Sequence, residues 1–132
     1  MSAVIDAWHE IAKSMDVVRL NEILADDVVF HSPVVHTPQR GRKMTALYLA
    51  SAFKVLNEPG HFHYLREVIA GNHAVLEFQT EIDGVIINGV DMIEWNDEGK
   101  IVDFKVMVRP LKAINAIHQA MGRMLEALQS KA

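Results

Sequence analysis

One aspartate and two histidines are the residues of this sequence whose types and positions could do acid–base chemistry. Asp91 interrupts GVDMIEW, which otherwise suits a buried strand, while His31 lies in VVFHSP and His63 ends HFH. Burial among apolar groups raises the pKa of a carboxyl group towards neutrality, where histidine titrates unaided. We therefore consider Asp91, His31 and His63 as candidate catalytic residues. The alternatives are that Asp91 only accepts structural hydrogen bonds and that His31 caps backbone groups or faces solvent.

A metal site is the second chemistry that these residues could support. His61 and His63 lie on one face of a predicted strand, and with His31 and Asp91 they could offer three nitrogens and one oxygen. Zinc needs its ligands to converge within about 2 Å, which no spacing in the sequence indicates. We therefore expect no metal and no other cofactor, and His63 is better explained as a polar group at a cavity wall. Cysteine is absent, which excludes thiolate catalysis and disulfides.

Hydrophobic periodicity and breaker residues predict the elements that must position these side chains. The first helix carries Ser2 as its N-cap, and a second short helix starts at Asp16. The segment DDVVFHSP is a strand, VVHTPQRG is a loop, and a helix from Arg42 to Asn57 ends at a breaker that includes Pro59. Four strands follow at 61–69, 74–82, 85–95 and 100–110, and a helix at 111–128 completes the chain. This order predicts an α+β domain with helices against one face of an antiparallel sheet.

Three turns determine which face of the sheet Asp91 occupies. The Asp83–Gly84 turn places Leu76 opposite Asp91, and NDEG places Phe104 opposite Asp91. The AGNH turn pairs strand 61–69 with strand 74–82 in the same way, although a bulge would slip any of these registers. The predicted core face contains His63, Leu65, Glu67, Leu76, Phe78, Ile87, Asp91, Ile93, Trp95, Val102, Phe104, Val106 and Val108.

The predicted outer face combines charged residues with more apolar ones than a solvated sheet needs. Its apolar members are Val75, Ile86, Val90, Met92 and Met107. An apolar patch of this kind marks an interface, so we expect a homodimer through the convex sheet face. Tyr64 and Arg109 fall on this face too, and Arg109 is expected to pair with Glu77 or Glu94.

Length and charge limit the possible partners. The 132 residues make one domain, and 50% apolar with 23% charged residues is a globular composition. A net charge of −4 argues against a nucleic-acid surface. Neither a secretory signal nor an apolar run of bilayer length is found, so we expect a cytoplasmic protein without membrane contact.

The motifs ADDVVFHSPVV, a Gly-Arg entry to a helix, and GVDMIEWNDEGKIVDFKVMVRP resemble the SnoaL-like branch of the nuclear transport factor 2-like superfamily. The resemblance covers nearly all of residues 1–132. It implies a curved antiparallel sheet wrapped round the N-terminal helices as a cone with an internal pocket. Relatives include ketosteroid isomerase, scytalone dehydratase, limonene-epoxide hydrolase and polyketide cyclases, so the fold does not settle the function. The chain departs from ketosteroid isomerase in having no tyrosine in its first helix.

We predict a cofactor-independent enzyme with a buried-aspartate acid–base site that acts on a small apolar or cyclic molecule by isomerisation, cyclisation, dehydration or hydrolysis. Asp91 is the acid or base, and His31 or His63 orients the substrate or relays protons. The expected substrate contacts are Tyr48, Phe53, Glu67, Phe78, Trp95 and Phe104. Two alternatives remain open: a non-catalytic binding module, and a dimerisation or scaffold domain with a vestigial pocket.

Overall fold

The computed structural model describes residues 2–57 and 60–130, and side chains up to residue 127. Four helices, one π-helical turn (η1) and six strands make up this part of the chain. The predicted breaker Pro59 lies outside the described residues. In chain order the elements are α1 Ala3–Ser14, α2 Val17–Ile23, β1 Leu24–His31, β2 Gln39–Arg40, α3 Arg42–Ala52, η1 Phe53–Asn57, β3 His63–Ala70, β4 His73–Ile82, β5 Val85–Trp95, β6 Ile101–Arg109 and α4 Leu111–Ser130.

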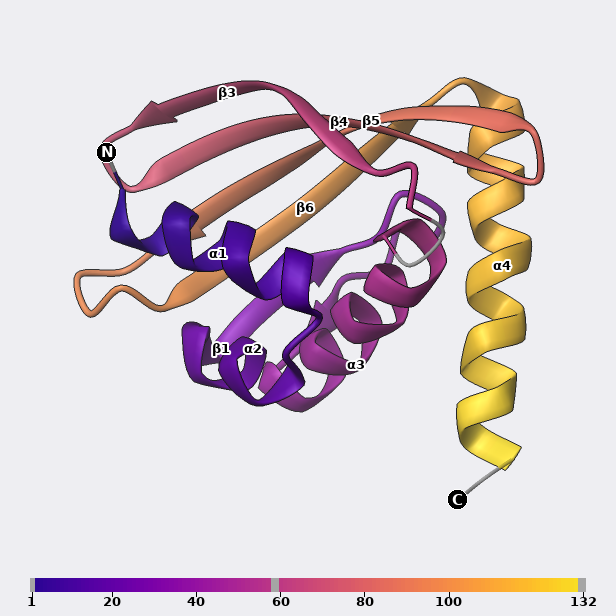
Figure 1. Ribbon diagram of the computed structural model, residues 1–132. Coiled ribbons are helices and arrows are strands. Elements are labelled where there is room, and N and C mark those ends of the chain that lie inside the picture. Colours follow the sequence, from indigo (N-terminus) through magenta and orange to yellow (C-terminus); the bar gives the residue numbers. More distant parts are fainter. Residues whose placement is uncertain (1, 58–59, 131–132) are drawn as a thin grey trace.

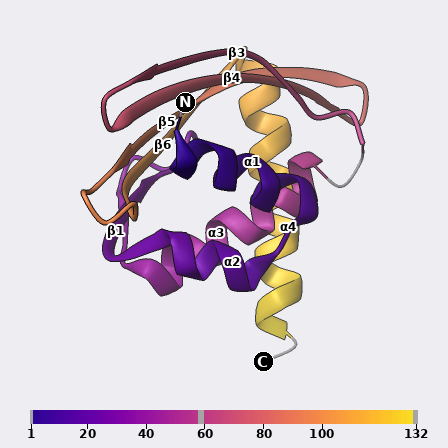
Figure 2. The same ribbon diagram turned by 60° about the vertical axis from the view of Figure 1, so that its left-hand side comes forward.

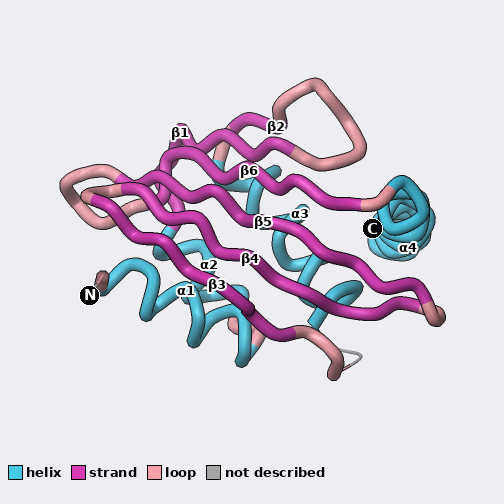
Figure 3. The backbone as a smooth tube through the Cα atoms, turned by 90° about the horizontal axis from the view of Figure 1, so that it is seen from above, coloured by secondary structure: helices cyan, strands magenta, loops and turns pink. Residues whose placement is uncertain are grey.

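The six strands form one curved, unclosed sheet in the order β2-β1-β6-β5-β4-β3. All neighbouring strands are antiparallel except β1 and β6, which run parallel. Helices α1, α2 and α3 lie beneath the concave face (Figures 1 and 2). The view from above in Figure 3 shows α4 standing at one end of the sheet. The predicted α+β cone is therefore confirmed. None of the described helices is both long and apolar enough to cross a membrane.

The N-terminal helices begin where their capping residues predict. Ser2 accepts a hydrogen bond from the backbone N–H of Ile5, and the Asp16 carboxylate accepts from the second and third residues of α2. Helix α1 ends at Met15, whose φ of 56° is left-handed. Trp8, on the buried stripe of α1, is thereby directed at the concave face of the sheet.

The β4–β5 hairpin has the predicted register. Asp83 and Gly84 both have positive φ angles, as a two-residue hairpin turn requires. Leu76 lies opposite Asp91, as predicted. On the other side of β5, Asp91 faces Val106, so its predicted pairing with Phe104 is wrong. The slip is two residues, an even number, so the predicted faces of this part of β6 are kept.

The register of β3 departs from the prediction in a way that reverses side chains. A bulge separates Tyr64, which pairs with Phe78, from Arg66, which pairs with Glu77. Leu65 is the extra residue and is 47% exposed, so its predicted place on the core face is wrong. Because the slip is one residue, Tyr64 turns to the concave face while His63 turns to the surface.

The predicted loop at 34–41 contains a short strand. Gln39 and Arg40 form β2, which pairs antiparallel with Phe30 and Val29 of β1. This pairing makes β2 an edge of the sheet and leads the chain directly into α3.

Candidate functional site

A cavity of about 80 Å³ lies between the concave face of the sheet and the helices. Eight of the nine aromatic residues of the chain line it. These are Trp8, Phe30, Tyr48, Phe53, Phe62, Tyr64, Phe78 and Phe104. The other lining residues are Ala12, Ser32, Pro33, Leu49, Ala52, Leu56, Asn57, Asp91, Val106, Ile117 and Met121. Ser32, Pro33, Tyr48, Leu56 and Met121 are partly exposed, so solvent approaches the cavity beside the end of β1, α3, η1 and α4.

Asp91 reaches the cavity because side chains alternate along β5. Gly89 lies two residues earlier on the same face, and it has no side chain to occupy the space there. A Cβ atom at Gly89 would lie 2.5 Å from Cζ of Phe78 and 2.8 Å from the carbonyl oxygen of Met107. The bare backbone therefore lets the Phe78 ring lie against β5 and wall the cavity near Asp91.

A chain of hydrogen bonds connects α1 to Asp91. Nε1–H of Trp8 donates to the Tyr64 hydroxyl at 2.9 Å. That hydroxyl in turn donates to Oδ2 of Asp91 at 3.1 Å. A phenol has one O–H, so the bond from Trp8 to its lone pair leaves that O–H directed at the carboxyl group. The sequence separation of Trp8 and Tyr64 is 56 residues, which makes this contact a product of the tertiary fold.

Burial changes the acidity of both groups. Asp91 is 6% exposed, and burial raises the pKa of its carboxyl group to about 7, although the bond from Tyr64 opposes the rise. Burial also raises the pKa of Tyr64 well above its ordinary value, and the negative charge of Asp91 raises it further. At neutral pH the carboxyl group is therefore populated in both protonation states, whereas the phenol keeps its proton.

Five of the nine residues predicted for the site line the cavity. They are Asp91, Tyr48, Phe53, Phe78 and Phe104. Phe78 and Phe104 wall the cavity and leave about 80 Å³ of it open. Trp95 is buried at the far end of β5, outside the lining.

The other three predicted residues lie outside the cavity lining. His31 points to the outer side of β1, where Nε2 is 2.9 Å from Oδ1 of Asp103. His63 is exposed, with Nδ1 3.1 Å from the carbonyl oxygen of His61. Glu67 contacts the ring of His9 at the surface. The predicted grouping of both histidines with Asp91 is therefore wrong in position.

Trp8 and Tyr64 are the site residues that sequence reasoning missed. Trp8 was not among the predicted site residues, and Tyr64 was placed on the outer face because the bulge at Leu65 left no mark in the alternation of β3. A usable signal was the demand of a buried carboxylate for a hydrogen-bond donor. Within the described residues, no group of three or more ligating side chains could hold a metal ion.

Residues 5–104 match the SnoaL-like domain family. The chain is similar to a steroid delta-isomerase from Pseudomonas aeruginosa, with 34% identity, coverage of 97% of this chain and 93% of that chain, and a TM-score of 0.91. It is also similar to an uncharacterised protein with a cystatin-like fold from Silicibacter pomeroyi, with 32% identity, coverage of 93% and 85%, and a TM-score of 0.85.

A more distant structure shares the fold alone. It is a protein with a ketosteroid isomerase-like fold from Catenulispora acidiphila, in complex with trimethylamine. Its identity to this chain is 15%, the coverage is 86% of this chain and 90% of that chain, and the TM-score is 0.64. No curated protein matches the sequence.

Proposed function

We propose that this chain, which belongs to the SnoaL-like domain family, is a small isomerase-type enzyme that moves a proton on an apolar carbonyl compound. The observation that carries the proposal is Asp91, a carboxyl group in an aromatic cavity with a pKa of about 7. A general acid or base works best when its pKa is close to the operating pH. The similarity to a steroid delta-isomerase supports the same reaction class.

Asp91 would act as base and then as acid within one reaction. The carboxylate takes a proton from a carbon beside the carbonyl group, and an enolate forms as the C–H electron pair moves into the new double bond. The protonated carboxyl group then returns the proton to another carbon of the conjugated system, which shifts the double bond and restores the enzyme. Ketosteroid isomerase combines an aspartate base with a tyrosine and a protonated aspartic acid in this chemistry. Here Asp91 is the one carboxyl residue among the described lining residues, so it takes the proton-transfer role alone.

Two hydroxyl groups could stabilise the enolate oxygen. Tyr48 and Ser32 line the cavity from α3 and from the end of β1. The Ser32 Oγ accepts a hydrogen bond from Val34, which leaves its proton available to a substrate. Tyr64 is committed to Asp91 and serves to position the carboxyl group.

The test uses β,γ-unsaturated ketones of two sizes, cyclohex-3-enone and a 3-ketosteroid. Isomerisation gives a conjugated enone whose ultraviolet absorbance reports turnover. We expect the substitution Asp91→Asn to lower kcat by about 10²–10⁴-fold, the usual contribution of a general acid or base. Asp27→Asn is the matched control, because it makes the same carboxylate-to-amide change at an exposed position outside the cavity lining. Unchanged turnover in Asp91→Asn would overturn the proposal.

The second candidate is binding of a small ligand without turnover. The size of the cavity favours it, because about 80 Å³ is roughly half of an apolar cavity that holds benzene. The Catenulispora protein, which shares this fold, is in complex with a ligand of similarly small size. Ligand that copurifies with the protein and is released chemically unchanged, together with inactivity towards both ketones, would favour binding over catalysis.

A further inference from the structure

Among the residues that the structure describes, the buried carboxyl group of Asp91 has no cationic partner. No lysine, arginine or histidine is found among the described residues that line the cavity. A buried carboxylate without a cation is costly, and it is stabilised either by taking a proton or by a cation that enters from outside. When it is ionised, Asp91 is therefore an anion in a cavity whose described lining residues supply no cation.

The hydrogen bonds around Asp91 leave acceptors for a ligand. The Nε1–H of Trp8 and the O–H of Tyr64 are both used within the relay that ends at Oδ2. Oδ1 accepts no hydrogen bond from the residues that the structure describes, and Tyr64 has one further lone pair. When Asp91 is ionised, this end of the cavity therefore offers acceptors alone, which suits a ligand that carries N–H groups.

The remaining wall is aromatic on several sides. The ring centroid of Trp8 lies 4.9 Å from that of Phe104 and 5.5 Å from that of Phe53. In a second group of rings, the centroid of Phe62 lies 5.1 Å from that of Tyr64 and 5.2 Å from that of Phe78. Aromatic rings attract cations through their faces within about 6 Å of the centroid, most strongly when water is excluded. The aromatic rings and the ionised carboxylate therefore both favour a positively charged ligand.

We infer that this cavity binds a small aliphatic ammonium ion, which donates its N–H groups to Asp91 and packs its alkyl groups against the aromatic rings. The enclosed volume matches an ion of about three to four non-hydrogen atoms, by proportion to the six of benzene in a 150 Å³ cavity. Isopropylammonium has that size. The inference names a ligand class for the site of the proposed function, and its test needs no turnover.

The test compares isopropylammonium with 2-propanol, a neutral molecule of the same shape and atom count. Binding is followed by the indole N–H resonances in 1H–15N NMR spectra, assigned with Trp95→Phe. Trp8 lines the cavity and its N–H belongs to the relay, whereas Trp95 lies outside the lining and is an internal reference. We expect isopropylammonium at pH 8 to shift the Trp8 resonance saturably, with an affinity at least about tenfold above that of 2-propanol.

Two carboxylate-to-amide variants test which carboxylate binds the ammonium ion. Asp91→Asn should lower the affinity for isopropylammonium by about tenfold or more and leave that for 2-propanol unchanged. Asp27→Asn, at an exposed position of β1 outside the cavity lining, should leave both unchanged. Equal affinities for the two ligands, equal shifts of both indoles, an unmoved Trp8 resonance, or an equal loss in Asp27→Asn would each overturn the inference. Binding without enone formation would leave the inference intact and count against catalysis alone.

Discussion

Asp91 and Glu77 are carboxyl groups on neighbouring strands, and their pKa values move in opposite directions. Leu76 lies opposite Asp91, so Glu77 is one residue further along β4 and on the other face of the sheet. On the concave face, burial raises the pKa of Asp91 to about 7. On the convex face, Nε of Arg66 donates to Glu77 at 2.6 Å and holds the pKa of Glu77 below its ordinary value of 4.5.

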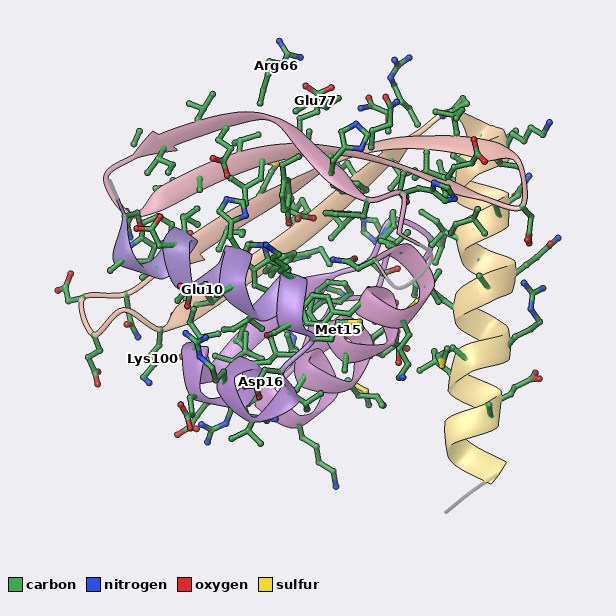
Figure 4. All side chains as sticks on the ribbon, viewed as in Figure 1. Glu10, Met15, Asp16, Arg66, Glu77 and Lys100 are labelled. Atoms are coloured by element: carbon green, nitrogen blue, oxygen red, sulfur yellow. The ribbon has the colours of Figure 1, made fainter. Side chains whose placement is uncertain are left out.

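The two faces differ in what they supply to a negative charge. Figure 4 shows Arg66 and Glu77 on the side of the sheet away from the helices. There Asn88 also donates to Glu77, at 3.0 Å, and itself accepts from Arg109. The concave face supplies aromatic rings and a single phenol donor. Glu77 is thus held ionised by its partners, whereas Asp91 is left with a variable protonation state that a reaction or a ligand can use.

Replacement of Asp91 by asparagine should give the largest change in stability. Because the pKa of Asp91 is higher in the folded protein than its ordinary value of 3.8, the folded state binds more protons between these two values. Wild-type stability should therefore fall as pH rises from about 4 to about 7, by about 4 kcal/mol in total, and then level off. Asp91→Asn lacks this slope and should be the more stable protein at pH 8. Urea unfolding at pH 4, 6 and 8 measures both curves.

The hydrogen bond from Tyr64 provides an internal control for the dependence of stability on pH. The bond lowers the pKa of Asp91, so Tyr64→Phe should move the midpoint of the pH dependence upwards by about one unit. Parallel wild-type and Asp91→Asn curves over this range would mean that Asp91 is not the buried acid described here.

The burial of Asp91 on β5 could be predicted from the sequence, because a local turn determines the register of this strand. Asp83 and Gly84 adopt the two positive φ angles that close a two-residue hairpin, and this register alone puts Asp91 inside. The slip in β6 did not disturb the result, since two residues preserve the alternation. Fold class and the burial of Asp91 therefore followed from turns and periodicity.

The donor to Asp91 could not be predicted in the same way. Strand β3 is an edge strand whose residues 65–70 are all exposed, so neither of its faces shows an apolar pattern. Its bulged register brings Tyr64 to Trp8, which lies in a helix far away in the sequence. His31 was misplaced for a related reason: the sequence does not reveal that β1 joins β6 in parallel, which brings Asp103 to it on the outer face.

Gly89→Ala should disturb the concave face by crowding without any change of charge. The new Cβ would overlap the Phe78 ring and the backbone of Met107, so the ring must move into the cavity. We expect a loss of about 1–3 kcal/mol, the usual cost of overpacking, and weaker binding at Asp91. Gly122→Ala is the control, because nothing lies within 4 Å of its Cβ position in α4 and helix propensity favours alanine. Adding Phe78→Leu to Gly89→Ala should recover part of the stability.

Apolar side chains surround the polar network of Arg66, Glu77 and Asn88 on the convex face, which leads to a prediction about association. Val75, Ile86, Met92 and Met107 are 37–50% exposed on it. We propose that a second copy of the chain covers this face. Ile86→Glu should then convert a dimer to a monomer in light scattering, since each buried apolar side chain contributes about 1–2 kcal/mol to association. Val18→Glu, at a 70% exposed position on α2, is the control. A monomeric wild-type protein at micromolar concentration would refute the dimer.

Glu77→Gln should give the smallest effect, with the opposite dependence on pH. The pKa of Glu77 is lower in the folded protein than its ordinary value of 4.5, so its ionised form stabilises the fold above that value. This stability is lost as pH falls through the folded pKa, so wild type and variant should differ slightly at pH 7 and converge in acid. Added salt should reduce the difference at pH 7, because Arg66 is exposed and its pairing is screened. Asp91→Asn behaves in the reverse manner: its stability agrees with that of the wild type in acid and exceeds it increasingly as pH rises from about 4 to about 7. If both variants changed stability in the same direction with pH, the two faces of the sheet would not differ in the way that the hydrogen bonds indicate.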